Sequence, residues 1–79
     1  MTVRLFARLR DIAGTAELVR DVPNGATVAT VWEALATEFP ELASYQSSIS
    51  SAVNADYAKM QSAVQDGDEV AFLPPVSGG

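Results

Sequence analysis

Cysteine and histidine are absent from the 79-residue chain. Without them the chain has no disulfide, no thiol nucleophile and no imidazole that could bind a metal or act as a general base. Lysine occurs once, and no apolar run approaches the ~18 residues of a membrane-spanning helix. We therefore expect no metal site, no membrane segment and no stand-alone active site.

The first residues, MTVRLFARLRDIAG, lack the apolar core and cleavage site of a signal peptide. Because the absence of cysteine also fits a reducing compartment, we expect a cytoplasmic protein. The formal net charge is −5: the first 20 residues hold four arginines against two acids, and the rest hold one lysine against eight acids. Such an acidic surface repels phosphate backbones, so we expect a protein partner and no nucleic acid.

Apolar alternation over residues 3–8 predicts a first strand, with Val3, Leu5 and Ala7 on the inner side and Phe6 on the outer side. A helical turn over residues 9–13 should end at Gly14. A second strand over residues 17–22 would then complete a hairpin.

The clearest predicted element is a helix that begins after Thr27, a residue suited to capping a helix N-terminus. Its apolar positions follow the helical repeat and share one stripe: Val28, Val31, Trp32, Leu35 and Phe39. Pro40 cannot continue the helix and should end it.

After the helix the pattern is weaker. Residues 42–51 predict a loop with a helical turn, and residues 52–53 a short strand followed by a turn at 54–56. Residues 57–64 are ambiguous. A turn at 66–68 leads into a last strand at 69–73.

This order of elements predicts an α+β fold of the β-grasp, ubiquitin-like class, with a mixed sheet of four to five strands packed on one main helix. The first and last strands would lie parallel in the centre of the sheet, because the long crossover between them allows it. We expect a β-grasp domain at residues 1–73 and an extended tail at 74–79.

Two apolar side chains are predicted to lie on the open side of the sheet. Phe6 stands between two arginines, and Leu73 joins it if Val70 and Phe72 face the helix. Burying Phe6 and Leu73 on a partner would yield about 1.5–3 kcal/mol each. Since single exposed apolar residues are ordinary, simple exposure is the alternative interpretation.

The last residues, Pro-Pro-Val-Ser-Gly-Gly, predict a stiff arm with a slender end. Pro74 and Pro75 fix the backbone and end sheet pairing, and Gly78 and Gly79 have no side chain and can pass a narrow channel. The terminal carboxylate would then be a chemical handle held away from the globule, although a frayed end is common at chain termini.

Other polar residues predict no site. Asp66 and Asp68 flank a glycine, a pattern that predicts a solvated turn. Lys59 is expected to be a solvated amine on the surface. The serines of residues 47–51 have no base near them in sequence that could activate them.

DGDEVAFLPPVSGG at residues 66–79, with Leu5-Phe6-Ala7, Arg10-Asp11, Gly14 and Ala52-Val53-Asn54, resembles the small sulfur-carrier subunits of molybdopterin synthase. The resemblance implies that a ubiquitin-activating-like adenylyltransferase uses ATP to adenylate Gly79. A sulfur donor then displaces AMP and leaves a thiocarboxylate. No bound cofactor is implied.

The same resemblance implies a large synthase subunit as partner. Pro74, Pro75, Val76, Ser77 and Gly78 would enter that subunit, while Phe6 and Leu73 dock the globule. The sulfur on Gly79 would attack a cyclic pyranopterin monophosphate to build the molybdopterin dithiolene. Two alternatives stay open: a sulfur carrier for another pathway, such as thiamine synthesis or tRNA thiolation, and a non-catalytic β-grasp binding module.

Overall fold

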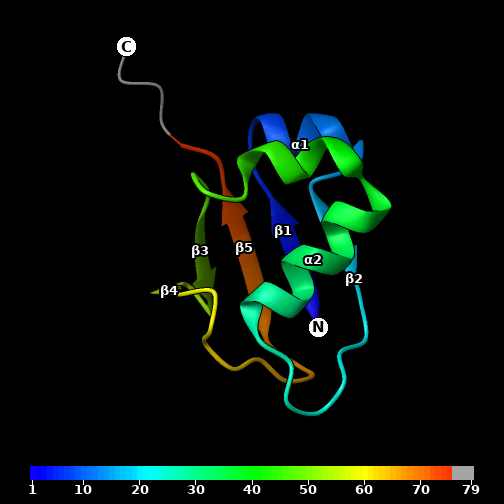
Figure 1. Ribbon diagram of the computed structural model, residues 1–79. Coiled ribbons are helices and arrows are strands. Elements are labelled where there is room, and N and C mark those ends of the chain that lie inside the picture. The colour runs from blue at the N-terminus through cyan, green and yellow to red at the C-terminus, as the bar shows by residue number, and fades with distance from the viewer. Residues whose placement is uncertain (76–79) are drawn as a thin grey trace.

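The computed structural model describes residues 1–75, which form one mixed sheet with helices on one of its faces (Figure 1). The elements are, in order, β1 (Thr2–Leu5), α1 (Arg8–Ala13), β2 (Glu17–Val19), α2 (Val28–Glu38), the 3-10 helix η1 (Pro40–Tyr45), β3 (Ser50–Val53), β4 (Asp56–Ala58) and β5 (Glu69–Leu73). The strand order is β2-β1-β5-β3-β4, and β1 and β5 are parallel whereas the other neighbours are antiparallel. The predicted β-grasp fold is confirmed, with five strands.

The core lies between the sheet and α2. The inward residues of the two central strands are at most 1% exposed: Val3, Leu5, Val70 and Phe72. Trp32 of α2 stands against them, with its ring centroid 5.0 Å from that of Phe72. The predicted helical stripe packs on this layer, although Phe39 is only partly buried.

Helix α2 begins where its sequence predicts. The Thr27 hydroxyl accepts a hydrogen bond from the amide of Thr30 (3.3 Å), and the Thr30 hydroxyl accepts one from the amide of Thr27 (3.1 Å). This reciprocal capping satisfies two amides that a helix start otherwise leaves without partners. The helix ends at Glu38, and Pro40 opens η1, because proline fits the first turn of a helix but not its interior.

The first strand is shorter than predicted, and the inward placement of Ala7 is wrong. β1 ends at Leu5, Ala7 is exposed, and α1 already begins at Arg8. The amide of Leu9 donates to the carbonyl of Phe6 (3.1 Å), which closes a turn, and Leu9 is fully buried. The alternating pattern favours a longer strand, but the chain instead turns into α1, which buries Leu9 in the core.

The second strand also ends early, at Val19 where 22 was predicted. The amide of Arg20 still donates to the carbonyl of Met1 (2.9 Å), and the Arg20 guanidinium binds Glu38 of α2 at 2.8 Å. The chain then leaves the sheet for Pro23, which cannot donate a ladder hydrogen bond. α1 itself ends at Gly14, in the left-handed conformation that its glycine favours.

Residues 57–64, for which the sequence pattern is ambiguous, contribute to the edge strand β4. This strand pairs with β3, and the two-residue turn Asn54–Ala55 connects them. Asp56, predicted to lie in the turn, is the first residue of β4. The last strand has the predicted bounds. Within residues 1–75, no helix has the length and apolar character needed to cross a membrane.

Candidate functional site

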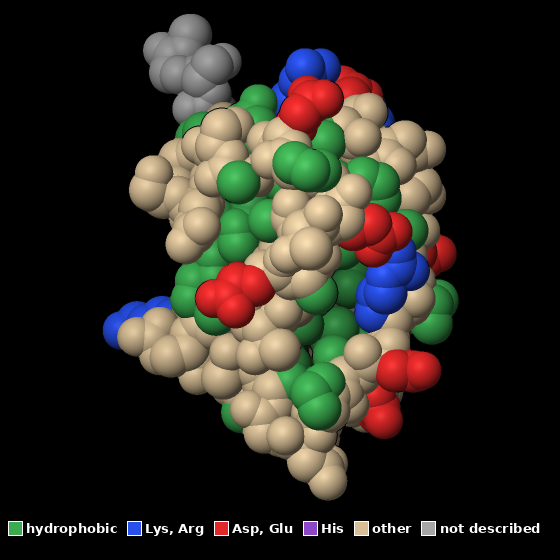
Figure 2. Space-filling view, turned by 45° about the vertical axis from the view of Figure 1, so that its right-hand side comes forward, with side chains coloured by type: hydrophobic (Ala, Val, Ile, Leu, Met, Phe, Trp, Pro, Cys, Tyr) green, Lys and Arg blue, Asp and Glu red, His purple; other side chains and the backbone are tan. Residues whose placement is uncertain are grey.

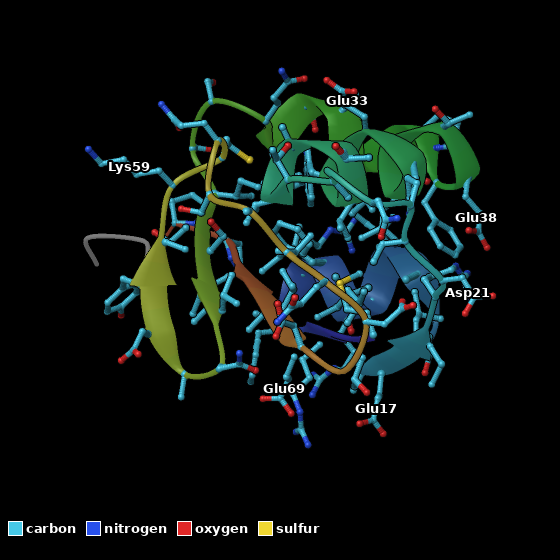
Figure 3. The ribbon with its side chains drawn as sticks, turned by 90° about the horizontal axis from the view of Figure 1, so that it is seen from below. Glu17, Asp21, Glu33, Glu38, Lys59 and Glu69 are labelled. Carbon is cyan, nitrogen blue, oxygen red and sulfur yellow. The ribbon has the colours of Figure 1, made fainter. Side chains whose placement is uncertain are left out.

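Within residues 1–75, no helix covers the face of the sheet opposite α2 (Figure 1). Seen from below, Glu17 and Glu69 project from this side, and Glu33 lies on the helix side (Figure 3). The strand register puts Arg4 beside Glu17 and Ala71, and Ala71 beside Ala52. Arg4 binds Glu69 at 3.0 Å and approaches Glu17 at 3.7 Å. The charge of Arg4 is therefore neutralised by the two neighbouring glutamates. Ala71 and Ala52 have small side chains, so the middle of this face is flat.

Phe6 and Leu73 lie together where β1 and β5 end. Both line a groove of about 520 Å³, with Ala7, Arg8, Tyr45, Pro74 and Pro75 completing its walls. Phe6 is 42% exposed, and its amide donates to the carbonyl of Phe72 at 3.3 Å. The structure thus brings the two predicted partner-binding residues to one groove, at the root of the tail.

The predicted tail is described only at its start. Pro74 is partly buried and Pro75 is exposed. Val76, Ser77, Gly78 and Gly79 lie outside the described residues, so their roles stay predictions.

Sequence reasoning missed Tyr57, the most exposed large hydrophobic side chain of the described residues, at 84%. It pairs with Ala52 in the register of β3 and β4, and so extends the row that runs from Arg4 through Ala71. The three-residue strand β4 is too short for alternation to reveal it. Once β4 is placed, the row across the open face runs from Glu17 and Arg4 through two alanines to Tyr57.

Asn54, for which the local pattern predicts only a turn, also joins two strands. Its backbone amide donates to the carbonyl of Glu69 (2.7 Å), and its side-chain oxygen accepts from the amide of Glu69 (3.0 Å). Its side-chain nitrogen donates to Asp68 at 3.0 Å. Asn54 therefore clamps the end of β3 to the start of β5.

The Asp66–Asp68 turn has the structural role that was predicted for it. The hydrogen bond from Asn54, and then that from the amide of Gln65, hold the pKa of Asp68 below its ordinary value of 3.8. Both bonds favour the charged carboxylate, which closes the turn.

Charge on the described surface is dispersed. Acidic side chains are spread over the face drawn in the space-filling view (Figure 2). Lys59 directly follows β4 and projects outward beyond this edge of the sheet, and no ion pair binds it within residues 1–75 (Figure 3). Among those residues no three His, Cys, Asp or Glu side chains are grouped so that they could hold a metal ion.

Comparison with known proteins gives consistent matches. The ThiS family matches residues 3–79. The chain is 38% identical to the molybdopterin synthase sulfur carrier subunit of Arabidopsis thaliana over 77 residues, covering 98% of this chain and 80% of that protein. It is 35% identical to the Chlamydomonas reinhardtii protein of the same name, covering 98% of this chain and 95% of that one.

A solved structure is also similar to this chain in both fold and sequence. The crystal structure of the small archaeal modifier protein SAMP1 from Haloferax volcanii superposes with a TM-score of 0.87 and 35% identity. The match covers 99% of this chain and 97% of that one.

Proposed function

The chain belongs to the ThiS family, and from this premise we propose that it is the sulfur-carrier subunit of a molybdopterin synthase. The observation that carries the proposal is the similarity to sulfur carrier subunits of that enzyme over 98% of the chain. The Pro-Pro-Val-Ser-Gly-Gly ending supports it. The globule then serves as the grip, and the last residue carries the chemistry.

The reacting atom is the carboxyl carbon of Gly79. A carboxylate is a poor acyl donor because its leaving group would be oxide. An adenylyltransferase of the ubiquitin-activating class transfers AMP from ATP to the carboxylate and releases pyrophosphate. A sulfide-level donor, such as hydrosulfide, then attacks the carbonyl carbon, AMP leaves, and Gly79 becomes a thiocarboxylate. The chain needs no cysteine for this, because the sulfur travels on the terminal acyl group.

The large synthase subunit is the partner that consumes the sulfur. Phe6, Leu73 and Tyr57 dock the globule on it, and Pro74 and Pro75 direct the tail into its active site. There the thiocarboxylate sulfur attacks a cyclic pyranopterin monophosphate and displaces an oxygen substituent, which joins Gly79 to the pterin as a thioester. Water then hydrolyses the acyl–sulfur bond, so that the sulfur stays on the pterin and Gly79 returns to a carboxylate; two such rounds build the dithiolene. Docking makes the attack effectively intramolecular, which lowers the barrier by several kcal/mol when the geometry is right.

We place this chemistry in the cytoplasm. The absence of cysteine from the chain fits a reducing compartment.

Intact-mass spectrometry tests the proposal. The chain is incubated with the adenylyltransferase, ATP and a sulfur donor, and we expect its mass to rise by the difference between one sulfur and one oxygen atom. Addition of the large subunit and cyclic pyranopterin monophosphate should return the original mass. A variant without Gly79 is the matched control and should not change. An unchanged mass for the full chain, with partners that charge a known carrier, would refute the proposal.

A modifier role is the second candidate function. It is favoured by the similarity to the small archaeal modifier protein 1 of Haloferax volcanii, 36% identical with both chains fully covered. A modifier would form covalent conjugates with other proteins through Gly79. The same incubation with cell extract separates the two functions, since conjugates appear as bands of higher mass and a thiocarboxylate does not.

A further inference from the structure

The chain reverses from β1 into α1 over two residues, Phe6 and Ala7. The amide of Phe6 donates to Phe72 of β5 (3.3 Å), the amide of Leu9 donates to Phe6 (3.1 Å), and the amide of Asp11 donates to Ala7 (3.2 Å). These three bonds fix the turn on both sides of Ala7. The backbone of Ala7 is held at φ 51° and ψ −125°.

This conformation suits glycine and not alanine. At positive φ the Cβ of an L-residue crowds the neighbouring carbonyl groups, and glycine has no Cβ. The chain does place glycines at other positive-φ positions, such as Gly14 and Gly67. The Ala7 side chain is exposed, so burial in the core does not offset the strain. The methyl group is therefore present at a cost to the fold.

Ala7 is one of the residues that line the groove at the tail root. Its neighbours there include Phe6, Leu73 and Pro74, which are apolar. Arg8 is the one charged residue among the described lining, and no ion pair within residues 1–75 engages it. As far as the described residues form it, the groove offers apolar side chains beside one arginine that has no ion-pair partner there.

We propose that this groove receives an apolar side chain of the large synthase subunit, with an acidic residue next to it. The Ala7 methyl contacts the apolar side chain, and the Arg8 guanidinium pairs with the carboxylate. Strain within a turn that its surroundings fix is typical of functional sites. The inference rests on the proposed function and deepens it, because it assigns two further docking residues and the chemistry of the partner's contact.

The first test compares Ala7→Gly with Ala55→Gly. Ala55 lies in the β3–β4 turn at φ 72°, so both substitutions relieve backbone strain. We expect each to raise the Tm by about 4–8 °C. Ala7→Gly alone should weaken binding of the large subunit, measured by calorimetry, by about four-fold, the value of one buried methyl group. A gain in stability with a loss of affinity is the signature of a strained contact residue.

The second test compares Arg8→Gln with Lys59→Gln. Each substitution removes one positive charge, but Lys59 lies outside the groove and projects outward beyond the β4 edge of the sheet (Figure 3). We expect Arg8→Gln to weaken binding about two- to five-fold at low ionic strength and to flatten its salt dependence. Lys59→Gln should bind as the unchanged chain does.

The outcomes separate this inference from the proposed function. If the unchanged chain does not bind the large subunit, the proposed function fails, and this inference fails with it. If the unchanged chain binds, but Ala7→Gly binds equally well or does not raise the Tm, the inference about Ala7 is wrong. Equal effects of Arg8→Gln and Lys59→Gln would refute the acidic neighbour.

Discussion

The two sides of the central strands β1 and β5 differ in what they contribute. On the side of α2, Val3, Leu5, Val70 and Phe72 are at most 1% exposed and belong to the core. On the other side, Arg4, Ala71 and Leu73 of the same strands remain at least partly exposed. Since successive residues of a strand point to opposite faces, one short strand can supply stability and binding side by side. The two roles should therefore be separable by mutating neighbours.

Phe72 and Leu73 make the sharpest such pair. Phe72→Ala removes a ring packed against Trp32, and we expect it to lower the free energy of unfolding by about 3–5 kcal/mol. A loss of that size approaches the whole stability of a domain this small. Leu73→Ala should cost less than about 1 kcal/mol of stability but about 1.5–3 kcal/mol of affinity for the large subunit.

Urea unfolding and calorimetry measure the two quantities. The comparison of the two sides would be broken if Leu73→Ala unfolded the domain as Phe72→Ala does. It would also be broken if Leu73→Ala left the affinity unchanged.

Phe6→Ala should weaken binding of the large subunit about ten-fold or more, because the ring is exposed in the free chain and the proposed docking would bury it. The melting temperature should change little, since the side chain lies outside the core. Val19→Ala is the matched control, because Val19 is 71% exposed on β2, away from the groove. Equal loss of affinity in both variants would show that Phe6 is not a specific contact for the large subunit.

Thr27→Ala is expected to change the stability of the fold without changing binding. It removes the hydroxyl that caps α2, and we expect a loss of about 1 kcal/mol in the free energy of unfolding. Thr37→Ala, which removes a hydroxyl inside the same helix, should cost less. Binding of the large subunit by the folded protein should not change in either variant, and a change would link α2 to docking.

The smallest expected effect is on the stability of the fold when Asp68 is replaced, and this effect depends on pH. Because the pKa of Asp68 is lower in the folded chain, its carboxylate stabilises the fold above the ordinary pKa of 3.8. This contribution fades as the pH falls through the folded pKa. We expect Asp68→Asn to be less stable than the unchanged chain near pH 6, and the difference to shrink near pH 2. A difference that is the same at both pH values would contradict the assigned cause.

Local signals explain which parts of the fold the sequence predicts. The start of α2 follows from Thr27, its end from Pro40, and β5 from an alternating run after a glycine turn. The end of β1 does not, because burial of Leu9 decides it and the local pattern favours a longer strand. β4 is defined by its pairing with β3, which no pattern within three residues can indicate.

The candidate site divides in the same way. Phe6 and Leu73 are predicted from side-chain parity, and the structure brings them to one groove. Tyr57 and Ala7 are not, because the first depends on the register of an edge strand and the second on a backbone angle. Asn54 is recognised only when β3 and β5 are seen to meet.

The central claim is that the globule binds while the last residue reacts. Its most direct test adds one tryptophan after Gly79 and measures, on the same sample, the affinity for the large subunit and the formation of the thiocarboxylate. We predict that the extended chain stays folded, with its docking face intact, yet acquires no sulfur from the adenylyltransferase and sulfur donor. An extended chain that is still charged with sulfur and still supports dithiolene synthesis, with its mass showing the tryptophan in place, would contradict the claim.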